Sequence, residues 1–464
     1  MTAGTRGLMQ SAPVARSITM TTDEQAVDAD ADVEGDDAAD GDGRSDGADD
    51  GLDDETREAV EEALEEVLEE YEIASGFPPE ALDEVDEITE GFRETIQEDA
   101  EDDERRDRRD LLTFTTDPKR AQDFDDAISL ERRDGGGWRL WVHIADVSHY
   151  VEPGTALYDA ARERASSVYL PGHTVHMLPP ELAETVCSLV PDEDRLAHTV
   201  EMALDEELAF DDVDIYKSVI RSDKRLTYTE TERLLEEGPG AVEGATPDLA
   251  VTVCDAYELA DGLHESRKEE GSLVLNPARD RAHTVVEECM LKANRAVTQE
   301  LLWDRGLEAM YRVHPQPTEE QWAEALQEIQ DLDGVSISAE HWDQPRHAVN
   351  EAIEGASERE LRKIQRAVLK VMPRAKYLSD PFGGHYALNF DIYGHFTSPI
   401  RRIADLVNHR IVHEHDVPDD LASLAEHASD RQRMADACER DFKKRLEELG
   451  LDPDQVEDYK FGEE

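Results

Sequence analysis

The chain has 464 residues, of which 39% are hydrophobic, so it is long enough for one large core or two to three ordinary domains. It contains no run of eighteen apolar residues, which excludes a membrane-spanning helix, and residues 1–19 lack the apolar core of a secretory signal peptide. The net charge of -64 is opposite to that of a typical nucleic-acid-binding protein.

The acidic charge extends well beyond the N-terminal region. Residues 21–104 hold 37 acidic residues against three arginines, and about half of the net charge belongs to residues 111–464. Such acidity with few lysines indicates a salt-saturated cytoplasm, where a Debye length of about 3 Å at 1 M salt screens the self-repulsion. This favours a halophilic archaeon as the source. The alternative is a mesophilic protein with an acidic tail, although the tail carries only half of the charge.

The cysteines predict the redox compartment. There are four, widely spaced and without a CxxC pair: Cys187, Cys254, Cys289 and Cys438. This pattern predicts free thiols in a reducing, cytoplasmic location and not a disulfide framework or a zinc knuckle.

The N-terminal part of the chain reads as an extension followed by helices. Residues 21–53 are low-complexity acid, glycine and alanine, so residues 1–53 are expected to be a disordered acidic extension that starts at Met1 or Met20. Apolar residues on one stripe predict a helix over 54–73, and a second acidic helix is expected over 80–104. Together they form an acidic helical lead-in, residues 54–110.

From residue 111 the pattern becomes strand-rich and later helical. The segments "LLTFTTD", "AISLERR", "WRLWVHIADVSHYV" and "RLAHTVEMALD" predict strands, with a hairpin turn at Gly135–Gly137. Helices are predicted over 247–267, 284–303, 318–331, 357–372, 398–415 and 420–450. This order predicts an α+β fold with a mixed sheet surrounded by helices over residues 111–450, followed by a tail, 451–464.

The stretch "TFTTDPKRAQDFDDAIS" concentrates four carboxylates: Asp117, Asp123, Asp125 and Asp126. Asp123 and Asp125 share one face of an extended segment, and converging carboxylates repel unless cations lie between them. Oxygen ligands without His or Cys favour Mg²⁺ or Mn²⁺ over zinc. The spacing is not that of an EF-hand, because the sixth position from Asp123 is Ile128. The alternative is a solvated acidic loop.

Two further stretches suggest ligand contacts. In "YGHFTSPIRRIADLVNHR", Ser398 is a natural helix N-cap, and Arg401 and Arg402 in the first turn would form a phosphate site. The alternative is an ordinary capped helix whose arginines pair with surface acids. In "RAHTVVEECMLKANRAV", Glu287 and Asn294 share one helix face, which indicates either a buried hydrogen-bond network or a ligand contact.

The chain resembles the RNB catalytic domain of the ribonuclease II and ribonuclease R family over about residues 105–450. The resemblance rests on the stretches above together with "VHIADVSHYV", "SSVYLPGHTVHMLPPELAETVCSLVP", "RLTYTE", "YRVH" and "GHYALNFDIYGHFTSPIRRIADLVNHR" in the same order. It implies a 3′-to-5′ exoribonuclease of RNA decay or processing that uses two Mg²⁺ ions, with Mn²⁺ as a substitute. The products implied are nucleoside 5′-monophosphates released from single-stranded RNA.

The resemblance also implies site residues. The aspartates match the family's metal-binding positions, and Asp125 and Asp126 with Arg401 match catalytic positions. Arg401 matches the arginine that contacts the scissile phosphate, and Tyr169 the tyrosine near the 3′-terminal nucleotide. RNA contacts are also implied for the following residues: Tyr228, Glu287 or its neighbour Glu288, Arg402 and Glu439.

These residue types suit the implied reaction. Two metal ions can activate a water and stabilise the leaving 3′ oxygen, while Arg401 offsets charge on the phosphate. Tyr169 supplies a stacking face, and contacts to the 2′-hydroxyl would reject DNA. We therefore expect single-stranded RNA as the partner of a monomer, with no membrane. The acidity is reconciled by local clusters of basic residues, at 105–109, 362–376, 401–402, 410 and 443–445.

The chain departs from the family in two ways. It shows no pattern for the RNA-binding barrels of larger relatives, which suggests a nearly isolated catalytic domain. The hairpin before "RAHTVVEE" is shortened to "NPARD", so the family's second base-clamping aromatic residue is not carried over and the product length stays open.

A non-catalytic RNA-binding protein of the same fold is the main alternative, and an endonuclease or a DNA-directed nuclease is a third. Zinc binding by the histidine pairs 173/176 and 413/415 is disfavoured.

Overall fold

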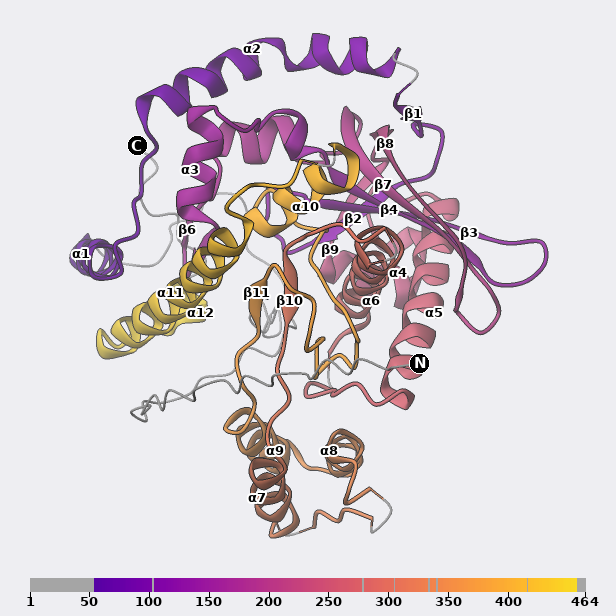
Figure 1. The fold of residues 1–464 in the computed structure, drawn as a ribbon, viewed down its shortest axis with the longest axis vertical. Helices are drawn as coiled ribbons and strands as arrows, with labels where there is room; N and C mark the ends of the chain where they lie inside the picture. Colours follow the sequence, from indigo (N-terminus) through magenta and orange to yellow (C-terminus); the bar gives the residue numbers. More distant parts are fainter. Residues whose placement is uncertain are drawn as a thin grey trace, which may run out of the picture.

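The computed structural model describes residues 54–456 apart from 102–103, 278, 304, 333, 339–340 and 415. The expected disordered extension, residues 1–53, and the end of the expected tail lie outside the described residues. The fold is α+β, as predicted: a mixed seven-stranded sheet is surrounded by helices (Figure 1).

The sheet has the strand order β1-β8-β7-β4-β3-β2-β9. Its central strands pair antiparallel, whereas β1 pairs parallel with β8 and β2 pairs parallel with β9. The strands are β1 (Arg106–Asp107), β2 (Phe114–Asp117), β3 (Asp126–Arg132), β4 (Trp138–Ala145), β7 (Asp194–Leu204), β8 (Phe210–Arg221) and β9 (Lys224–Thr227). The predicted hairpin joins β3 to β4, and Gly137 has a φ of 75° there, in the left-handed region that favours glycine.

Helices cover both faces of the sheet (Figure 1). On one side lie α2 (Pro79–Ala100), α3 (Ala156–Arg164) and the π-helical η2 (Glu181–Cys187). On the other lie α4 (Tyr228–Glu237), α5 (Pro247–Glu269) and α6 (Arg281–Ala296), followed by the π-helical η4 (Val297–Trp303). Their apolar faces and the sheet form the largest buried cluster, which also takes in residues of α10 (Ile403–Glu414).

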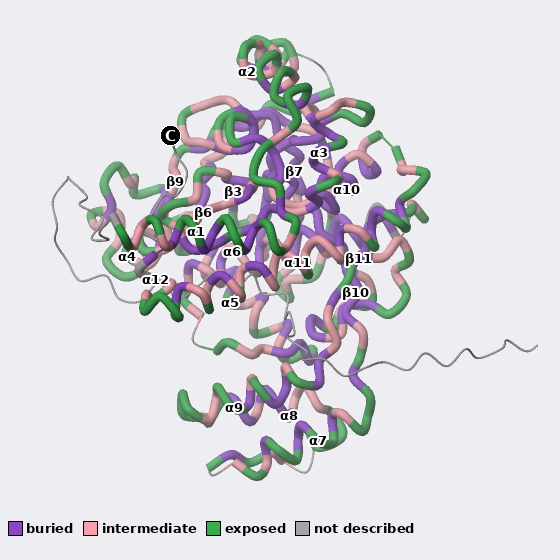
Figure 2. Tube along the Cα trace, turned by 90° about the vertical axis from the view of Figure 1, so that its left-hand side faces the viewer, coloured by how far each residue is buried: buried purple, intermediate pink, exposed green. Residues whose placement is uncertain are grey.

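A helical lobe stands at one end of the molecule (Figures 1 and 2). It consists of α7 (Glu319–Gln330), α8 (Pro345–Glu354) and α9 (Glu358–Leu369), which bury a second apolar cluster. The antiparallel pair β10 (Tyr311–Val313) and β11 (Lys376–Leu378) joins the lobe to the rest of the protein. The helices expected over 318–331 and 357–372 are confirmed, whereas α8 had no sequence-based prediction.

A third cluster joins the two ends of the described chain. Helix α1 (Asp54–Glu70), expected over 54–73, packs against α11 (Leu421–Glu448), and Val60 and Val67 are buried together with Phe442 and Leu446. The hairpin of β5 (Val168–Leu170) and β6 (His173–Val175) and the short α12 (Pro453–Val456) complete the cluster. The domain boundaries expected at residues 53, 110 and 450 stay a prediction.

The expected helix start at Ser398 is wrong. Helix α10 begins at Ile403, and residues 399–401 form a turn that precedes it. Arg402 N–H donates to the Ser398 carbonyl (3.0 Å) as in a helix, but tertiary contacts interrupt the next bonds, because Ile403 N–H donates to the Ala165 carbonyl (2.9 Å) and the Arg401 carbonyl accepts Ser167 N–H (3.0 Å). Arg401 and Arg402 therefore lie in the half-buried turn before α10 and not in the first turn of a helix.

Smaller differences concern short elements. The strand expected through "VSHYV" ends at Ala145, and Val147–His149 is the 3₁₀ helix η1; a second one, η3, covers Pro239–Ala241. The four cysteines are free thiols, as predicted, and only Cys254 is exposed. Among the helices that the structure describes, none has the length and apolarity that crossing a membrane requires.

Candidate active site

The fold brings the four aspartates to one place. Asp117 is the last residue of β2 and Asp126 the first residue of β3. These strands are antiparallel, with Phe114 opposite Ile128, so the end of β2 lies beside the beginning of β3. Asp123 and Asp125 lie in the connection that enters β3.

The cluster carries the electrostatic signature of crowded carboxylates. Burial raises the pKa of Asp117 well above its usual range, and the charge of Asp126 raises it further. Burial likewise raises the pKa of Asp125 well above its usual range and also raises the pKa of Asp123. Asp117 Oδ2 is buried and accepts no hydrogen bond from the described residues. The positive charge near the cluster thus does not compensate for burial and repulsion, and a bound cation would supply more.

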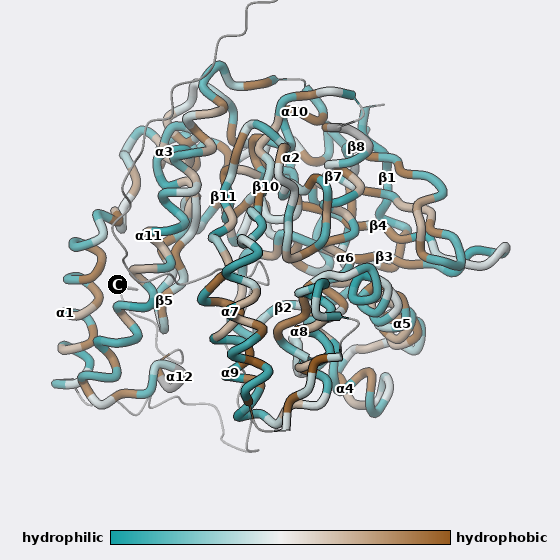
Figure 3. The backbone as a smooth tube through the Cα atoms, turned by 60° about the horizontal axis from the view of Figure 1, so that its bottom comes forward, coloured by the Kyte–Doolittle hydropathy of each residue, from teal (hydrophilic) through white to brown (hydrophobic). Residues whose placement is uncertain are grey.

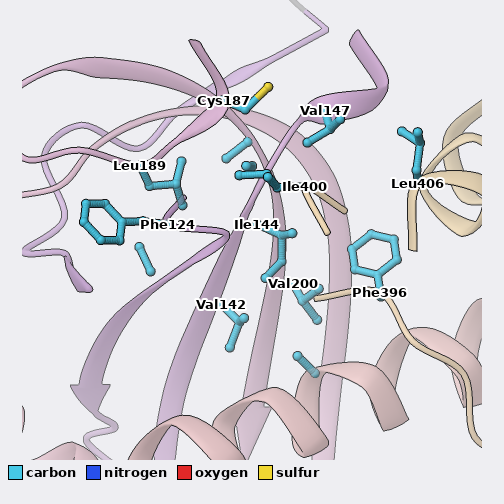
Figure 4. Packing of buried hydrophobic residues seen from close by; sticks show 14 of the residues in the cluster. Phe124, Val142, Ile144, Val147, Cys187, Leu189, Val200, Phe396, Ile400 and Leu406 are labelled. Carbon is cyan, nitrogen blue, oxygen red and sulfur yellow. The ribbon is translucent and has the colours of Figure 1, made fainter. Parts of the chain in front are cut away.

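Backbone contacts fix Asp125 in the cluster. Its side chain accepts Ile400 N–H (2.9 Å), its carbonyl accepts Ala145 N–H (2.8 Å), and the residue is 5% exposed. The preceding residue is held as firmly, since Phe124 N–H donates to Ser188 Oγ (3.0 Å). Figure 4 shows Phe124 and Ile400 in one buried apolar group next to the strands. The position of this carboxylate is therefore set by the core.

Arg401 faces the aspartates from the turn before α10. Its charge lowers the pKa of Asp123 and of Asp125 against the effect of burial, which places its guanidinium close to both. The turn is tied to α3 and β5, because the Arg401 carbonyl accepts Ser167 N–H (3.0 Å). It is tied to α10 by Asp405, which is fully buried and binds the Arg402 guanidinium through two hydrogen bonds of 2.9 Å.

Two tyrosines border the cluster. Tyr169 in β5 is 36% exposed, and its hydroxyl donates a long hydrogen bond to Asp123 Oδ2 (3.4 Å). Tyr228 directly follows Thr227, which is paired with Asp117 across β9 and β2, and its ring centroid lies 3.9 Å from that of His283. Tyr169 therefore touches the cluster, and Tyr228 directly follows the strand that pairs with β2.

The donor set fits hard divalent cations. The oxygens of the four aspartates are ligands that Mg²⁺ and Mn²⁺ prefer. Within the described part of the chain, no group of three or more His, Cys, Asp or Glu side chains is arranged so that it could hold a metal ion by itself. Magnesium usually binds one or two carboxylates, and water and substrate phosphates complete its shell. The aspartates therefore fit a site that the protein forms only in part.

Comparison with known proteins places the chain in a family. A profile of the RNB domain matches residues 105–416. The ribonuclease R of Aquifex aeolicus is 36% identical over 400 residues, which cover 80% of this chain and 55% of that protein. The chain belongs to the RNB domain family. It spans about half the length of the ribonuclease R proteins that it matches, with shares of 55, 52 and 48% for three of them.

Solved structures share the RNB fold. Mycoplasma genitalium RNase R in complex with ribose-methylated single-stranded RNA matches with a TM-score of 0.72 at 23% identity, over 83% of this chain and 64% of that one. Yeast Ssd1, described as a pseudonuclease, matches with a TM-score of 0.59 at 22% identity, over 76% of this chain and 44% of that one. Because the fold occurs in a nuclease and in a pseudonuclease, the fold alone does not decide activity.

Several expected RNA-contacting residues of this RNB chain lie in ion pairs of their own. Glu287 pairs with Arg279 and with Arg267 (3.4 Å), and its buried neighbour Glu288 pairs with Arg267 (2.5 Å). Glu439 pairs with Lys443 along α11 (2.7 Å). The roles expected for Glu287 and Glu439 stay predictions.

The alternatives left open for Asn294 are resolved. This buried side chain accepts Phe396 N–H (2.7 Å) and donates to the hydroxyls of Tyr393 (3.1 Å) and Thr397 (3.3 Å). It therefore belongs to a buried hydrogen-bond network that links α6 to the segment leading to Ser398.

Three polar residues beside the aspartates had no sequence-based prediction at this site. Arg225 in β9 donates to the Pro118 carbonyl (2.6 Å), and its charge lowers the pKa of Asp117 against the effect of burial. The charge of His176 acts in the same way on Asp123. Asp405 fixes the turn that carries Arg401. The sequence offered one signal for these residues, which is that they lie inside the quoted motifs. Their proximity to the aspartates depends on tertiary contacts, such as the pairing of β2 with β9 for Arg225.

Proposed function

We propose that this RNB chain is a 3′-to-5′ exoribonuclease that hydrolyses single-stranded RNA to nucleoside 5′-monophosphates by two-metal-ion catalysis. The observation that carries the proposal is the cluster of four buried or half-buried aspartates with Arg401 beside it. The 36% identity to a protein named ribonuclease R supports it, as does the RNA in the complex of the Mycoplasma structure.

The aspartates would hold the metal ions. Asp117, Asp123, Asp125 and Asp126 supply the carboxylates, for Mg²⁺ or for Mn²⁺ in its place. Bound divalent cations supply Lewis acidity that activates water and offsets charge on the leaving oxygen. The protein's own part is to keep Asp125 in place through Ile400 N–H and to keep the carboxylates away from bulk water.

Arg401 and the tyrosines would orient the RNA. The Arg401 guanidinium faces the carboxylates that would hold the metal ions. It can therefore offset charge on a scissile phosphate bound at the same place. The exposed ring of Tyr169 offers a stacking face for the 3′-terminal base. We extend the proposal to RNA contacts by Tyr228, Glu287, Arg402 and Glu439, to a preference for RNA over DNA, to a monomer, and to a cytoplasmic role in RNA decay or processing.

A non-catalytic RNA-binding protein of the same fold is the second candidate. The structural match to a protein described as a pseudonuclease, at 22% identity, shows a shared fold alone and does not favour this candidate. Retention of all four aspartates together with Arg401 opposes it, because binding alone does not need buried carboxylates that repel one another.

A time course with 5′-labelled single-stranded RNA and Mg²⁺ tests the proposal. The wild type should shorten the RNA from its 3′ end, and Asp125→Asn should not. Asp134→Asn is the matched control, since it removes an exposed carboxylate from the β3–β4 hairpin, and it should degrade RNA like the wild type. Unchanged RNA with retained binding would favour the RNA-binding candidate, and internal cuts would indicate an endonuclease.

A further inference from the structure

One surface of this acidic protein is strongly basic. Residues 357–376 contain seven lysines and arginines but only two acidic residues, although the whole chain has 48 basic and 112 acidic residues. This segment covers α9 and leads into β11. Its charge therefore runs against that of the molecule as a whole.

The fold gathers these cations on one face of α9. The positions repeat every three or four residues, so they fall on one stripe of the helix. All five side chains are exposed: Arg359, Arg362, Lys363, Arg366 and Lys370. The opposite face buries Ile364, Ala367 and Val368 in the core of the lobe. We call the five cations the basic ridge. In Figure 3, which brings this end of the molecule forward, α9 shows polar stretches alternating with apolar ones.

Few acidic partners neutralise the basic ridge. Arg362 pairs with Glu358 (2.8 Å) and Lys370 with Glu328 (3.8 Å), and all four of these side chains are more than half exposed. Among the described residues, no acidic side chain lies within ion-pair distance of the other three cations of the ridge: Arg359, Lys363 and Arg366.

The basic cluster at 105–109 is different, because its arginines bind acids of the sheet and of α2. Arg105 pairs with Asp146 (2.8 Å), and Arg109 pairs with Asp194 (2.9 Å). That cluster, expected from the sequence to offer local positive charge to RNA, is instead paired with acidic residues of the protein itself. The side chains of the basic ridge, by contrast, are exposed to solvent.

Aromatic side chains are exposed in and beside the same lobe. Phe382 follows β11 and is 78% exposed, and Trp342, just before α8, is 43% exposed. The segment after Phe382 packs against the lobe, where Arg346 of α8 donates to Asn389 Oδ1 (2.7 Å). It continues to the turn at Ile400, which contacts Asp125. One continuous segment thus leads from the lobe to the aspartates.

We propose that the basic ridge and Phe382 bind the single-stranded RNA outside the active site, upstream of the 3′ end being degraded. Cations on one stripe can contact successive phosphates, and an exposed aromatic ring can stack on a base. The exposed aromatics favour RNA over an acidic protein segment, such as residues 21–53 of this chain, because only RNA offers bases for stacking. The inference rests on the proposed function for the identity of the RNA.

The test measures binding of two 5′-fluorescent RNAs, of roughly 30 and roughly 8 nucleotides, by anisotropy in EDTA at several KCl concentrations. The ridge variant is R362Q/K363Q/R366Q in the full chain. The matched control is R132Q/R139Q/R221Q, which removes three half-exposed arginines from the sheet, away from the lobe (Figure 1). A separate Phe382→Ala variant tests stacking.

Three lost phosphate contacts should weaken binding of the long RNA about tenfold and lower the slope of log K against log [KCl] by about 2. Phe382→Ala should weaken long-RNA binding without changing this slope. The control variant should bind like the wild type, and all variants should bind the short RNA equally in EDTA and shorten it equally once Mg²⁺ is added. Loss of cleavage in the wild type with ridge-dependent binding would contradict the proposed function and leave the ridge proposal intact.

Equal binding of the long RNA by the wild type and the ridge variant would overturn the inference. In that case, carbodiimide crosslinks between Lys363 and a carboxylate of residues 21–53 would identify the acidic segment as the partner of the ridge. An equal loss of affinity in the ridge and control variants would also overturn it, because only the total charge would then matter.

Discussion

Asp117 combines features that favour ligand binding over stability. Its carboxylate is buried, it is repelled by Asp126, and one of its oxygens accepts no hydrogen bond from the described residues. A buried carboxylate whose pKa is raised destabilises the folded state at neutral pH, because it must be ionised without full compensation. Such a residue is expected where a bound cation supplies the missing charge.

The first prediction follows for Asp117→Asn. In EDTA the variant should be more stable than the wild type, by on the order of 1 kcal/mol, since the repulsion is removed. RNA hydrolysis should fall about a hundredfold or more, because a ligand oxygen is lost. The rise in melting temperature on adding Mg²⁺ should also be smaller in the variant. Thermal unfolding with and without Mg²⁺ measures both effects, and a variant less stable in EDTA would contradict the argument.

Asp405 acts on the site through the turn before α10. It is fully buried, accepts Ser398 N–H and holds Arg402 through both carboxylate oxygens. The charge of Arg402 and the hydrogen bonds keep the pKa of Asp405 low although burial alone would raise it. Asp405 therefore positions Arg401 without touching the aspartates.

The second prediction separates positioning from stability. Asp405→Asn leaves the Arg402 guanidinium buried without its partner and should cost about 3–5 kcal/mol of unfolding free energy. The double variant D405N/R402Q removes both charges and should recover most of that stability. Its turnover number should still be reduced, because the turn with Arg401 loses its anchor. Wild-type turnover in a stable double variant would show that the pair serves the fold alone.

At the scale of elements, the sequence predicted what local pattern encodes. Alternating and 3.6-residue apolar patterns located β3, β4, β7 and most of the longer helices, and four aspartates within ten residues located the candidate metal site. The start of α10 was misplaced because Ile403 N–H and the Arg401 carbonyl bond to the backbone of Ala165 and Ser167, contacts that no local pattern records. Arg225 was missed for the same reason, since its place depends on the parallel pairing of β9 with β2.

A series of hydrogen-bonded polar side chains crosses the sheet in the protein interior. Thr113 is hydrogen-bonded to Ser129 (2.7 Å), Ser129 to His143 (3.1 Å), His143 to Thr199 (2.8 Å) and Thr199 to Ser218 (2.7 Å). This series of hydrogen bonds therefore links β3, β4, β7 and β8 with the residue just before β2. Burial lowers the pKa of His143 to about 3, so the folded protein requires the neutral ring.

The third prediction concerns pH and stability. The unfolded chain binds a proton at His143 near pH 6.5, whereas the folded chain does not bind it until about pH 3. The unfolded state therefore binds more protons in this window, and stability is lost as the pH falls. At pH 5 this residue should cost about 2 kcal/mol. Chemical denaturation of the wild type and of His143→Gln between pH 7 and pH 5 measures it: the variant should lose about that much less, and parallel curves would contradict the assignment.

At the scale of the whole molecule, the apolar packing that stabilises the fold is opposed by repulsion between acidic residues. Three apolar clusters hold the sheet, the lobe and the packed ends of the chain together, yet the net charge is -64. Much of this charge lies on described helices such as α1, whose outer face is acidic and whose inner face packs on α11. Repulsion between these exposed acids destabilises the compact state unless salt screens it.

The fourth prediction is that the melting temperature rises between about 0.1 and 2 M KCl, because the Debye length falls from about 10 Å to less than 3 Å. Uncharged sucrose at equal osmolality is the control for general solvent effects. The variant E61Q/E62Q/E65Q/E69Q removes exposed acids of α1 that are not paired with Arg445, and its gain from salt should be smaller. If the destabilising charge lay only in the N-terminal acidic segment, melting would be nearly independent of KCl. A steep salt requirement would instead agree with the predicted origin in a salt-saturated cytoplasm, since charge spread over the folded surface is stable only where ions are abundant.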